Sequence, residues 1–272
     1  FTRDTRMKTT HITTATALSL STVLLAGCFG SGGTAQRDFN SPAGTVNVTA
    51  VSIDNLSESS SSDSGTIDLS ADELALGQTS GSLNSDRTKL NVDAGGTGTL
   101  TAAGDATYAR FFEVNPTNGP RRIGVIGIDS ASLPAGSAVY TGAGNLTIQD
   151  NLDVLDLTGT VNVTADFDSG TVDTVYTDLN GTRNPAFSAT QTATDVGTFR
   201  VEGSRISGTG FSGGTASLDS ATVNGGNALS TQHSTSLSGG FYGPDADEVG
   251  AAFVVDDTTV NAVSVRGAFI AD

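Results

Sequence analysis

The feature that most constrains this chain is a two-residue alternation of apolar and polar side chains, in short runs separated by Gly, Asn and Asp. The segment 45–53, for example, carries Val46 and Val48 and then shifts phase to Val51 and Ile53. Successive side chains of a β-strand point to opposite faces, so this period is typical of half-buried strands. The intervening residue types are those that tight turns require. The pattern therefore predicts an all-β fold.

Composition agrees with strands and excludes several classes of function. The 272 residues include 34 Gly, and 13 basic against 29 acidic residues give a net charge of −16. This balance argues against a nucleic-acid partner, because phosphate binding needs clustered basic side chains. One Cys and two His are too few for a disulfide framework or a Cys/His zinc site. We accordingly expect no metal and no cofactor.

Residues 1–27 have the pattern of a secretory signal. We expect Met7 to be the true start, with the six residues before it an upstream extension, and Lys8 to supply the positive charge. The apolar run 15–26 is shorter than the ~20 residues that a membrane span needs. It ends in Leu-Ala-Gly-Cys28, which resembles the bacterial lipobox, in which the Cys is acylated and becomes the first mature residue. A plain signal peptide with a chance Cys is the alternative.

Residues 28–43 are expected to be an acylated Cys and a flexible tether, because Gly and Ser dominate the segment and pack poorly. Several acyl chains together give stable membrane anchoring. Phe29, not Asp, follows the Cys, and by resemblance to enteric lipoproteins this residue permits export to the outer membrane. The sequence therefore predicts a lipid anchor in the cell outer membrane, followed by a folded body.

The body is expected to have two regions, of which the first, 44–133, is small and β-rich. Its predicted strands cover 45–53, 66–69, 97–101, 106–114 and 122–128. One helix-like turn is predicted over 70–77, because Ser70 is a suitable N-cap, Glu73 stands at capping-box spacing and Gly77 ends the run.

In the second region, 134–272, apolar and polar side chains alternate more regularly. Its predicted strands cover 138–143, 155–167, 170–177, 197–202, 205–211, 215–218, 237–243, 249–255 and 261–269. Eight or nine short antiparallel strands in about 140 residues match the size of a small closed barrel. Closure also removes the exposed edges of such Thr- and Val-rich strands.

A family resemblance appears near the C-terminus. Residues 239–253 read Gly-Gly-Phe-Tyr-Gly-Pro, an acidic turn, and then Val-Gly-Ala-Ala-Phe, and residues 263–269 end in Gly-Ala-Phe. This pattern resembles the C-terminal barrel domain of transferrin-binding-protein-B-like bacterial lipoproteins. Segments 138–144 and 160–171 more loosely resemble the opening strands of that domain. The resemblance covers about residues 135–272 and implies an eight-stranded antiparallel up-and-down β-barrel.

Ten residues of this motif are predicted to carry the fold and not chemistry. They are Gly239, Gly240, Phe241, Tyr242, Gly243, Pro244, Gly250, Phe253, Gly267 and Phe269. The glycines permit sharp coiling. Phe241 and Tyr242 alternate, so we expect one inside the barrel and the other at its rim, whereas Phe253 and Phe269 supply core volume. The acidic residues after Pro244 are expected to hydrate the turn.

The sequence gives little support for a catalytic site. Two Asp-Ser-Gly-Thr runs, 63–66 and 168–171, are similar to aspartic-protease elements, but turn use is the favoured interpretation of both. His233 is expected to be exposed in a polar run, and no Gly-x-Ser-x-Gly sequence frames a nucleophile. The protein is therefore predicted not to be an enzyme.

Two kinds of polar cluster offer binding alternatives. Acidic groups at Asp166, Asp168, Asp173 and Asp178, and at Asp245, Asp247 and Glu248, are potential Ca²⁺ ligands, although solvated turns are favoured. A basic and aromatic set is a candidate interaction patch, because Arg and aromatic residues dominate binding hot spots. It comprises Tyr108, Arg110, Phe112, Arg121 and Arg122. A barrel-facing strand with a solubilising turn is the alternative.

The resemblance implies a function of binding. The family's receptors are about twice this length and have two lobes, each with a handle domain and a barrel. We expect a lipoprotein of the outer membrane facing the extracellular side, which captures a protein or a small nutrient complex, with iron or haem uptake as the first hypothesis. A TonB-dependent transporter or an outer-membrane translocator would be its partner. A structural or adhesive envelope protein is the alternative.

Overall fold

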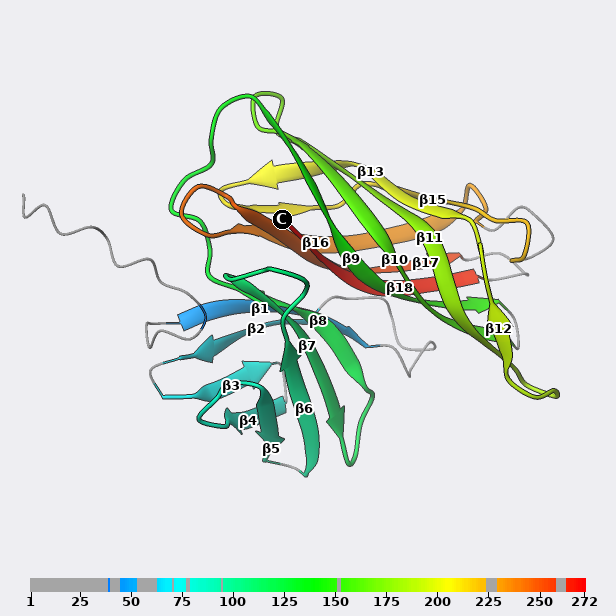
Figure 1. The fold of residues 1–272 in the computed structure, drawn as a ribbon, viewed down its shortest axis with the longest axis horizontal. Coiled ribbons are helices and arrows are strands. Elements are labelled where there is room, and N and C mark those ends of the chain that lie inside the picture. The colour runs from blue at the N-terminus through cyan, green and yellow to red at the C-terminus, as the bar shows by residue number, and fades with distance from the viewer. Residues whose placement is uncertain are drawn as a thin grey trace, which may run out of the picture. The chain divides into compact units, whose positions relative to one another are not determined.

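The computed structural model describes the part of the chain that follows the predicted signal, apart from several loops. The described residues are 39, 45–52, 63–69, 71–76, 79–93, 95–150, 153–223, 229–257 and 263–272. They form strands and turns (Figure 1). No helix long and apolar enough to cross a membrane occurs among them. The predicted lipidation site, Cys28, lies outside the described residues.

The first eight strands form a closed antiparallel barrel, in which β1 pairs with both β2 and β8 (Figure 1). The strands are β1 (Thr45–Ser52), β2 (Asp63–Asp68), β3 (Glu73–Leu76), β4 (Thr79–Leu83), β5 (Lys89–Val92), β6 (Gly96–Thr101), β7 (Ala109–Pro116) and β8 (Arg122–Gly127). Its interior holds alternate apolar residues such as Val46, Val48 and Leu100. The region expected only to be small and β-rich is thus a barrel in its own right.

The helix-like turn predicted over 70–77 is wrong where the structure describes it. Glu73–Leu76 forms strand β3, which pairs with β2 and β4. Leu74 and Leu76 alternate into the barrel with exposed neighbours, so a period of two outweighs the capping-box spacing in so short a segment. Strands β4 and β5 escaped prediction because they are only five and four residues long and carry one and two large apolar residues, respectively.

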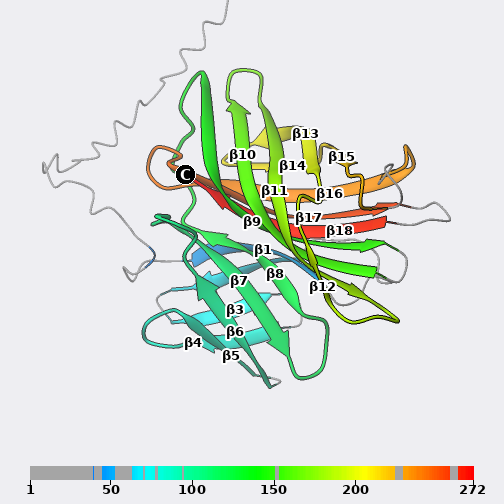
Figure 2. The same ribbon diagram turned by 45° about the vertical axis from the view of Figure 1, so that its right-hand side comes forward.

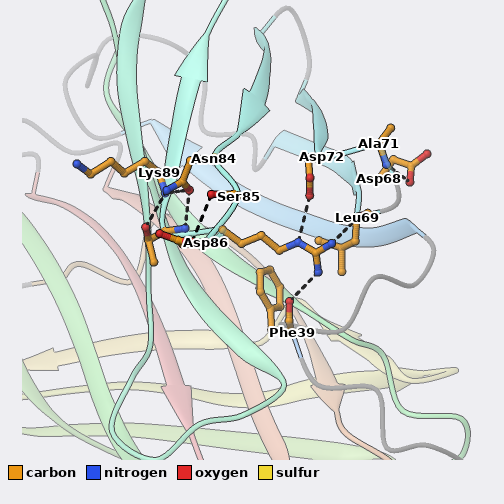
Figure 3. Close-up of polar contacts among 11 residues, drawn as sticks. Phe39, Asp68, Leu69, Ala71, Asp72, Asn84, Ser85, Asp86 and Lys89 are labelled. Atoms are coloured by element: carbon orange, nitrogen blue, oxygen red, sulfur yellow. Dashed lines mark hydrogen bonds and ion pairs between the residues drawn. The ribbon is translucent and has the colours of Figure 1, made fainter.

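Phe39, which the sequence placed in the flexible tether, is instead part of the first barrel. Its side chain is 1% exposed and belongs to the barrel core. The buried Arg87 guanidinium donates hydrogen bonds to the carbonyls of Phe39 (3.1 Å) and Leu69 (2.6 Å) and pairs with Asp72 at 3.1 Å; these three partners are labelled in Figure 3. The predicted tether 28–43 therefore contains a point of attachment to the folded body.

The second set of strands also closes. Its long members are β9 (Ser137–Asp150), β10 (Asp153–Asp166), β11 (Thr171–Pro185), β13 (Thr198–Ser207), β16 (His233–Tyr242), β17 (Glu248–Asp257) and β18 (Val263–Ala271), and its short ones are β12 (Gln191–Ala193), β14 (Gly210–Ser212) and β15 (Thr215–Asp219). The pairing order runs β11–β10–β9–β18–β17–β16–β14–β13, and β13 pairs back onto β11 (Figure 2). These eight strands form the predicted antiparallel up-and-down barrel, with β12 and β15 added at its margins.

The core of the second barrel centres on aromatic rings. Tyr176 contacts Phe199, Phe253 and Phe269 edge-on, with ring centroids 5.8, 5.8 and 6.1 Å apart. Phe199 and Phe253 stack at 5.1 Å. Edge-to-face and offset pairs add to the free energy of area burial. The positions predicted as core volume, Phe253 and Phe269, do lie in this cluster.

Strands β17 and β18 are buried on both faces. One face fills the second barrel, and the other, with Ala252, Val254, Ala268 and Ile270, packs against residues of the first barrel. These strands consequently read as nearly continuous apolar runs. Burial on both faces explains why their alternation is lost, as it is in other doubly covered strands.

Replacing Phe253 with Ala should lower the free energy of unfolding by about 3–5 kcal/mol, because the ring is fully buried among other rings. Phe187→Ala is the matched control, since Phe187 is 87% exposed and its loss should change the free energy by less than about 0.5 kcal/mol. Denaturant unfolding measures both. Equal effects of the two variants would contradict the assignment of the core.

Candidate functional site

The motif predicted to carry the fold spans the β16–β17 hairpin and β18. Phe241 points into the second barrel, where its ring lies 5.2 Å from that of Phe167. Gly239 and Gly240 belong to β16, Gly250 to β17 and Gly267 to β18, while Gly243, with φ +85°, and Pro244 form the turn.

Tyr242, expected at the rim of the barrel, is the last residue of β16. It is 4% exposed and packs between the barrels, and burial raises its pKa well above the ordinary value. A methyl group on Gly127 of β8 would lie 2.3 Å from Cδ1 of Tyr242. A methyl group on Gly250 of β17 would lie 2.9 Å from Cγ1 of Val125 in β8. Glycine is therefore required at these two positions, where β8 and β17 each contact the other barrel.

Glu248, expected in a hydrated turn, joins the two barrels. It is 3% exposed, and its carboxylate accepts hydrogen bonds from the backbone N–H groups of Thr107, Tyr108 (3.0 and 3.1 Å) and Ala109 (2.8 Å). Burial raises the pKa of Glu248, and the N–H groups with the Arg110 guanidinium only partly oppose this rise. The contact links the start of β17 to the start of β7.

Arg266 makes a second link of this kind. It is 2% exposed, donates a hydrogen bond to the carbonyl of Ser52 in β1 (2.6 Å), and lies 3.8 Å from Asp256. The Ser264 hydroxyl holds the same Asp256 carboxylate at 2.6 Å. A charged group from the second barrel is thus used to bind the backbone of the first.

The predicted basic and aromatic patch is not one surface. Tyr108 is 4% exposed between the barrels, and Phe112 is 1% exposed inside the first barrel. The Arg110 guanidinium lies 5.3 Å over the Phe39 ring, and Arg122 donates to the Thr79 hydroxyl (2.6 Å). Alternation along β7 sends its side chains to opposite faces, so residues adjacent in sequence are separated in space.

Arg121, the fifth member of that set, lines a cleft between the two barrels. The cleft consists of hollows of about 330 and 270 Å³ that share Glu113, Ile123 and Asn145. Arg121 Nη1 lies 3.9 Å from a carboxylate oxygen of Glu113. The sequence could not identify this cleft, because its walls come from strands of both barrels.

Three of the acidic residues proposed as Ca²⁺ ligands, Asp166, Asp168 and Asp173, accept hydrogen bonds from backbone N–H groups. Asp166 accepts from the N–H groups of Asp168 and Ser169 (both 3.0 Å), and the Ser169 N–H holds the pKa of Asp166 below its ordinary value. Asp168 accepts from Gly136 and Asp173 from Gly203. Within the described residues no group of three His, Cys, Asp or Glu is placed to hold a metal ion.

The two Asp-Ser-Gly-Thr runs differ in structure. Residues 168–171 do form the expected turn, with Gly170 at φ +70°. Residues 63–66 instead belong to strand β2, where Gly65 lies so close to β3 that a methyl group would be 2.3 Å from the Ala75 carbonyl oxygen. His233 opens β16 and its Nδ1 lies 2.6 Å from the Ser230 carbonyl oxygen.

Replacing Glu248 with Ala should lower the free energy of unfolding by about 2–4 kcal/mol, because buried N–H donors of Tyr108 and Ala109 lose a charged acceptor. Asp245→Asn is the control, since Asp245 is exposed in the same turn. Chemical denaturation of the full chain measures both. A Glu248→Ala protein as stable as the control would show that this link is dispensable.

A pH-dependent contribution is expected from Tyr140, whose hydroxyl donates to the Ala246 carbonyl at 2.8 Å. Burial, and secondarily the charge of Asp247, raises the pKa of Tyr140 from 10 to about 12. A raised pKa favours the protonated form in the folded state, so its stabilisation is complete below pH 10 and is lost as the pH rises through about 12.

Tyr140→Phe should therefore lower the free energy of unfolding by about 1 kcal/mol at neutral pH, through loss of one buried hydrogen bond. The difference from wild type should shrink as the pH rises above 10. Denaturant unfolding at a series of pH values measures this difference. A gap that stays constant to pH 12 would contradict the assigned titration.

Comparisons with known proteins agree with this geometry. The family model described as the C-lobe and N-lobe beta barrels of Tf-binding protein B matches residues 133–272. Among solved structures, a single-residue variant of Transferrin Binding Protein B from Haemophilus parasuis Hp5 has a TM-score of 0.56 at 19% identity, covering 84% of this chain and 45% of that chain. A search of the curated proteins found no match.

Two further structures show the same fold. Intact Ap-TbpB, with N and C lobes, has a TM-score of 0.52 at 19% identity over 84% of this chain and 45% of that one. Isotype 1 Transferrin binding protein B from serogroup B Neisseria meningitidis has a TM-score of 0.51 at 19% identity, and the match covers 84% of this chain and 43% of that one. The chain thus spans less than half of the length of each of these relatives. Through its second barrel, this chain belongs to the family of the transferrin-binding protein B β-barrels.

Proposed function

We propose that this protein is a non-enzymatic binding module, anchored by lipid in the outer membrane and facing the extracellular side, which captures a protein ligand for iron acquisition. The observation that carries this proposal is membership of a family described by its transferrin-binding protein, together with two closed barrels that share the fold of such proteins. The relatives are named for binding transferrin, so transferrin is the first ligand to test.

The lipid anchor is proposed at Cys28, with the tether after it. Phe39 stands eleven positions later and is fixed in the first barrel by Arg87. A fully extended chain of that length reaches at most about 40 Å. The end of the first barrel that holds Phe39 would accordingly be the end nearer the membrane.

A first ligand contact is proposed at Phe187. In the described part of the chain, Phe187 and Val139 are the large apolar side chains that are exposed, at 87% and 70%. Phe187 lies in the hairpin between β11 and β12. Exposed aromatic side chains that enter a partner's pocket dominate many protein interfaces.

The test begins with protease treatment of intact native cells, with a periplasmic protein that must stay uncut as control. Cleavage of the body is expected. Purified protein is then tested against iron-loaded transferrin, and Phe187→Ser should weaken binding at least about tenfold. Val139→Ser is the matched control and should bind like wild type.

Protection from the protease until the outer membrane is permeabilised would overturn extracellular capture. Cleavage without transferrin binding would overturn transferrin as the ligand. Binding that Phe187→Ser leaves unchanged would overturn the proposed contact alone. A partner transporter would be sought only after the first two results.

A further inference from the structure

One wall of the inter-barrel cleft carries polar side chains in register across neighbouring strands. Thr158 of β10 stands opposite Asn145 of β9 and opposite Asn180 of β11. All three are exposed on the outer face of the second barrel and line the larger hollow. The Asn180 amide is fixed, because it donates to the Asp178 carbonyl (2.6 Å) and accepts from the Asp195 N–H (3.0 Å).

Asn145 and Thr158 differ from Asn180 in this respect. Neither side chain hydrogen-bonds to another group within the described residues. The Asn145 amide and the Thr158 hydroxyl therefore line the cleft with donors and acceptors that a ligand can use. An Asn amide both donates and accepts, as does a hydroxyl. Next to them, the Thr147 hydroxyl donates to Asp156 at 3.0 Å and orients that carboxylate.

The facing wall, from the first barrel, combines hydroxyl groups with an apolar surface. Thr99 and Thr101 of β6 line the smaller hollow beside Phe111 and Ile123. Register places Thr101 opposite Phe111 and Thr99 opposite Glu113. This wall thus combines two hydroxyl groups with an aromatic and an aliphatic side chain.

The charge of the cleft is almost balanced. Glu113 and Asp156 are opposed by Arg121, which leaves one negative charge. A polyanion is therefore disfavoured, and so is a strongly cationic ligand. Neutral amides, hydroxyls and a few charged groups beside an apolar surface instead suit a compact ligand with many hydroxyl groups and apolar C–H faces. Each hollow, at about 330 and 270 Å³, is close to the lower size of small-molecule sites.

We propose that the cleft between the barrels is a binding site for a neutral saccharide. Asn145 and Thr158 hydrogen-bond its hydroxyl groups from one side, Arg121 and Glu113 do so from the other, and Phe111 contacts the C–H face of a sugar ring. Phe187 is not among the residues that line the cleft, and the proposal does not depend on protein capture at Phe187.

The test measures saccharide binding to the full chain by saturation-transfer-difference NMR. The probes are lactose, cellobiose, maltose and N,N′-diacetylchitobiose, with 3′-sialyllactose and a heparin-derived disaccharide as anionic comparators. At least one neutral probe should bind, and each anionic probe should bind more weakly. Asn145→Ala and Thr158→Val should each weaken binding about three- to tenfold, the loss expected for one hydrogen bond.

Asn91→Ala is the matched control, because Asn91 is an exposed asparagine of β5 outside the cleft. It should leave the affinity unchanged, and thermal unfolding should show that all three variants are folded. The proposal is overturned if no neutral probe binds at about 10 mM, if the cleft variants bind as well as the control, or if an anionic probe binds more tightly. None of these results bears on protein capture.

Discussion

The buried carboxylate of Glu248 is the interaction on which the arrangement of this molecule most depends. It begins β17 in the second barrel and accepts the N–H groups of three consecutive residues, 107–109, where β7 of the first barrel begins. A buried charge is tolerated only when its hydrogen-bonding capacity is met. Here three N–H donors from one backbone segment satisfy the carboxylate of Glu248. These hydrogen bonds join the second barrel to the first.

Other contacts extend this junction along β17 and β18. Arg266 binds the Ser52 carbonyl of β1, while Ala252, Val254 and Ile270 supply apolar area against the first barrel. Small residues and glycines let the two curved sheets approach, and Tyr242 fits over Gly127. A third hydrophobic core therefore lies between the two barrels, and the cleft opens beside it.

Much of the fold could be predicted from the sequence, because a period of two is a local property. The turns and long strands of the second region, and its aromatic core at Phe253 and Phe269, followed from alternation and from the motif at 239–253. The first barrel was harder. Its strands β3 to β5 are only four or five residues long, too short for alternation to be distinguished in the sequence, and pairing with neighbouring strands decides them.

The candidate site was less accessible to prediction. Of the predicted basic and aromatic set, Tyr108 lies between the barrels and Phe112 inside the first barrel. Only Arg121 and one side of Phe112 line the cleft. Residues adjacent in a strand point to opposite faces of the sheet. The cleft is instead lined by residues from β6 to β11 that share no local sequence pattern.

The sequence by itself therefore determined the long strands and the turns of the second barrel and the family to which that barrel belongs. These properties depend on local alternation, on turn residues and on a sequence motif. Only the tertiary structure decided that the first region closes into a barrel, that Phe39 and Glu248 are buried, and where a polar cleft opens. Those outcomes depend on which strands pair and which faces meet. The pairing of β1 with β8 and the contacts of Glu248 with Tyr108 and Ala109 join residues far apart in the sequence, so no local pattern gives them.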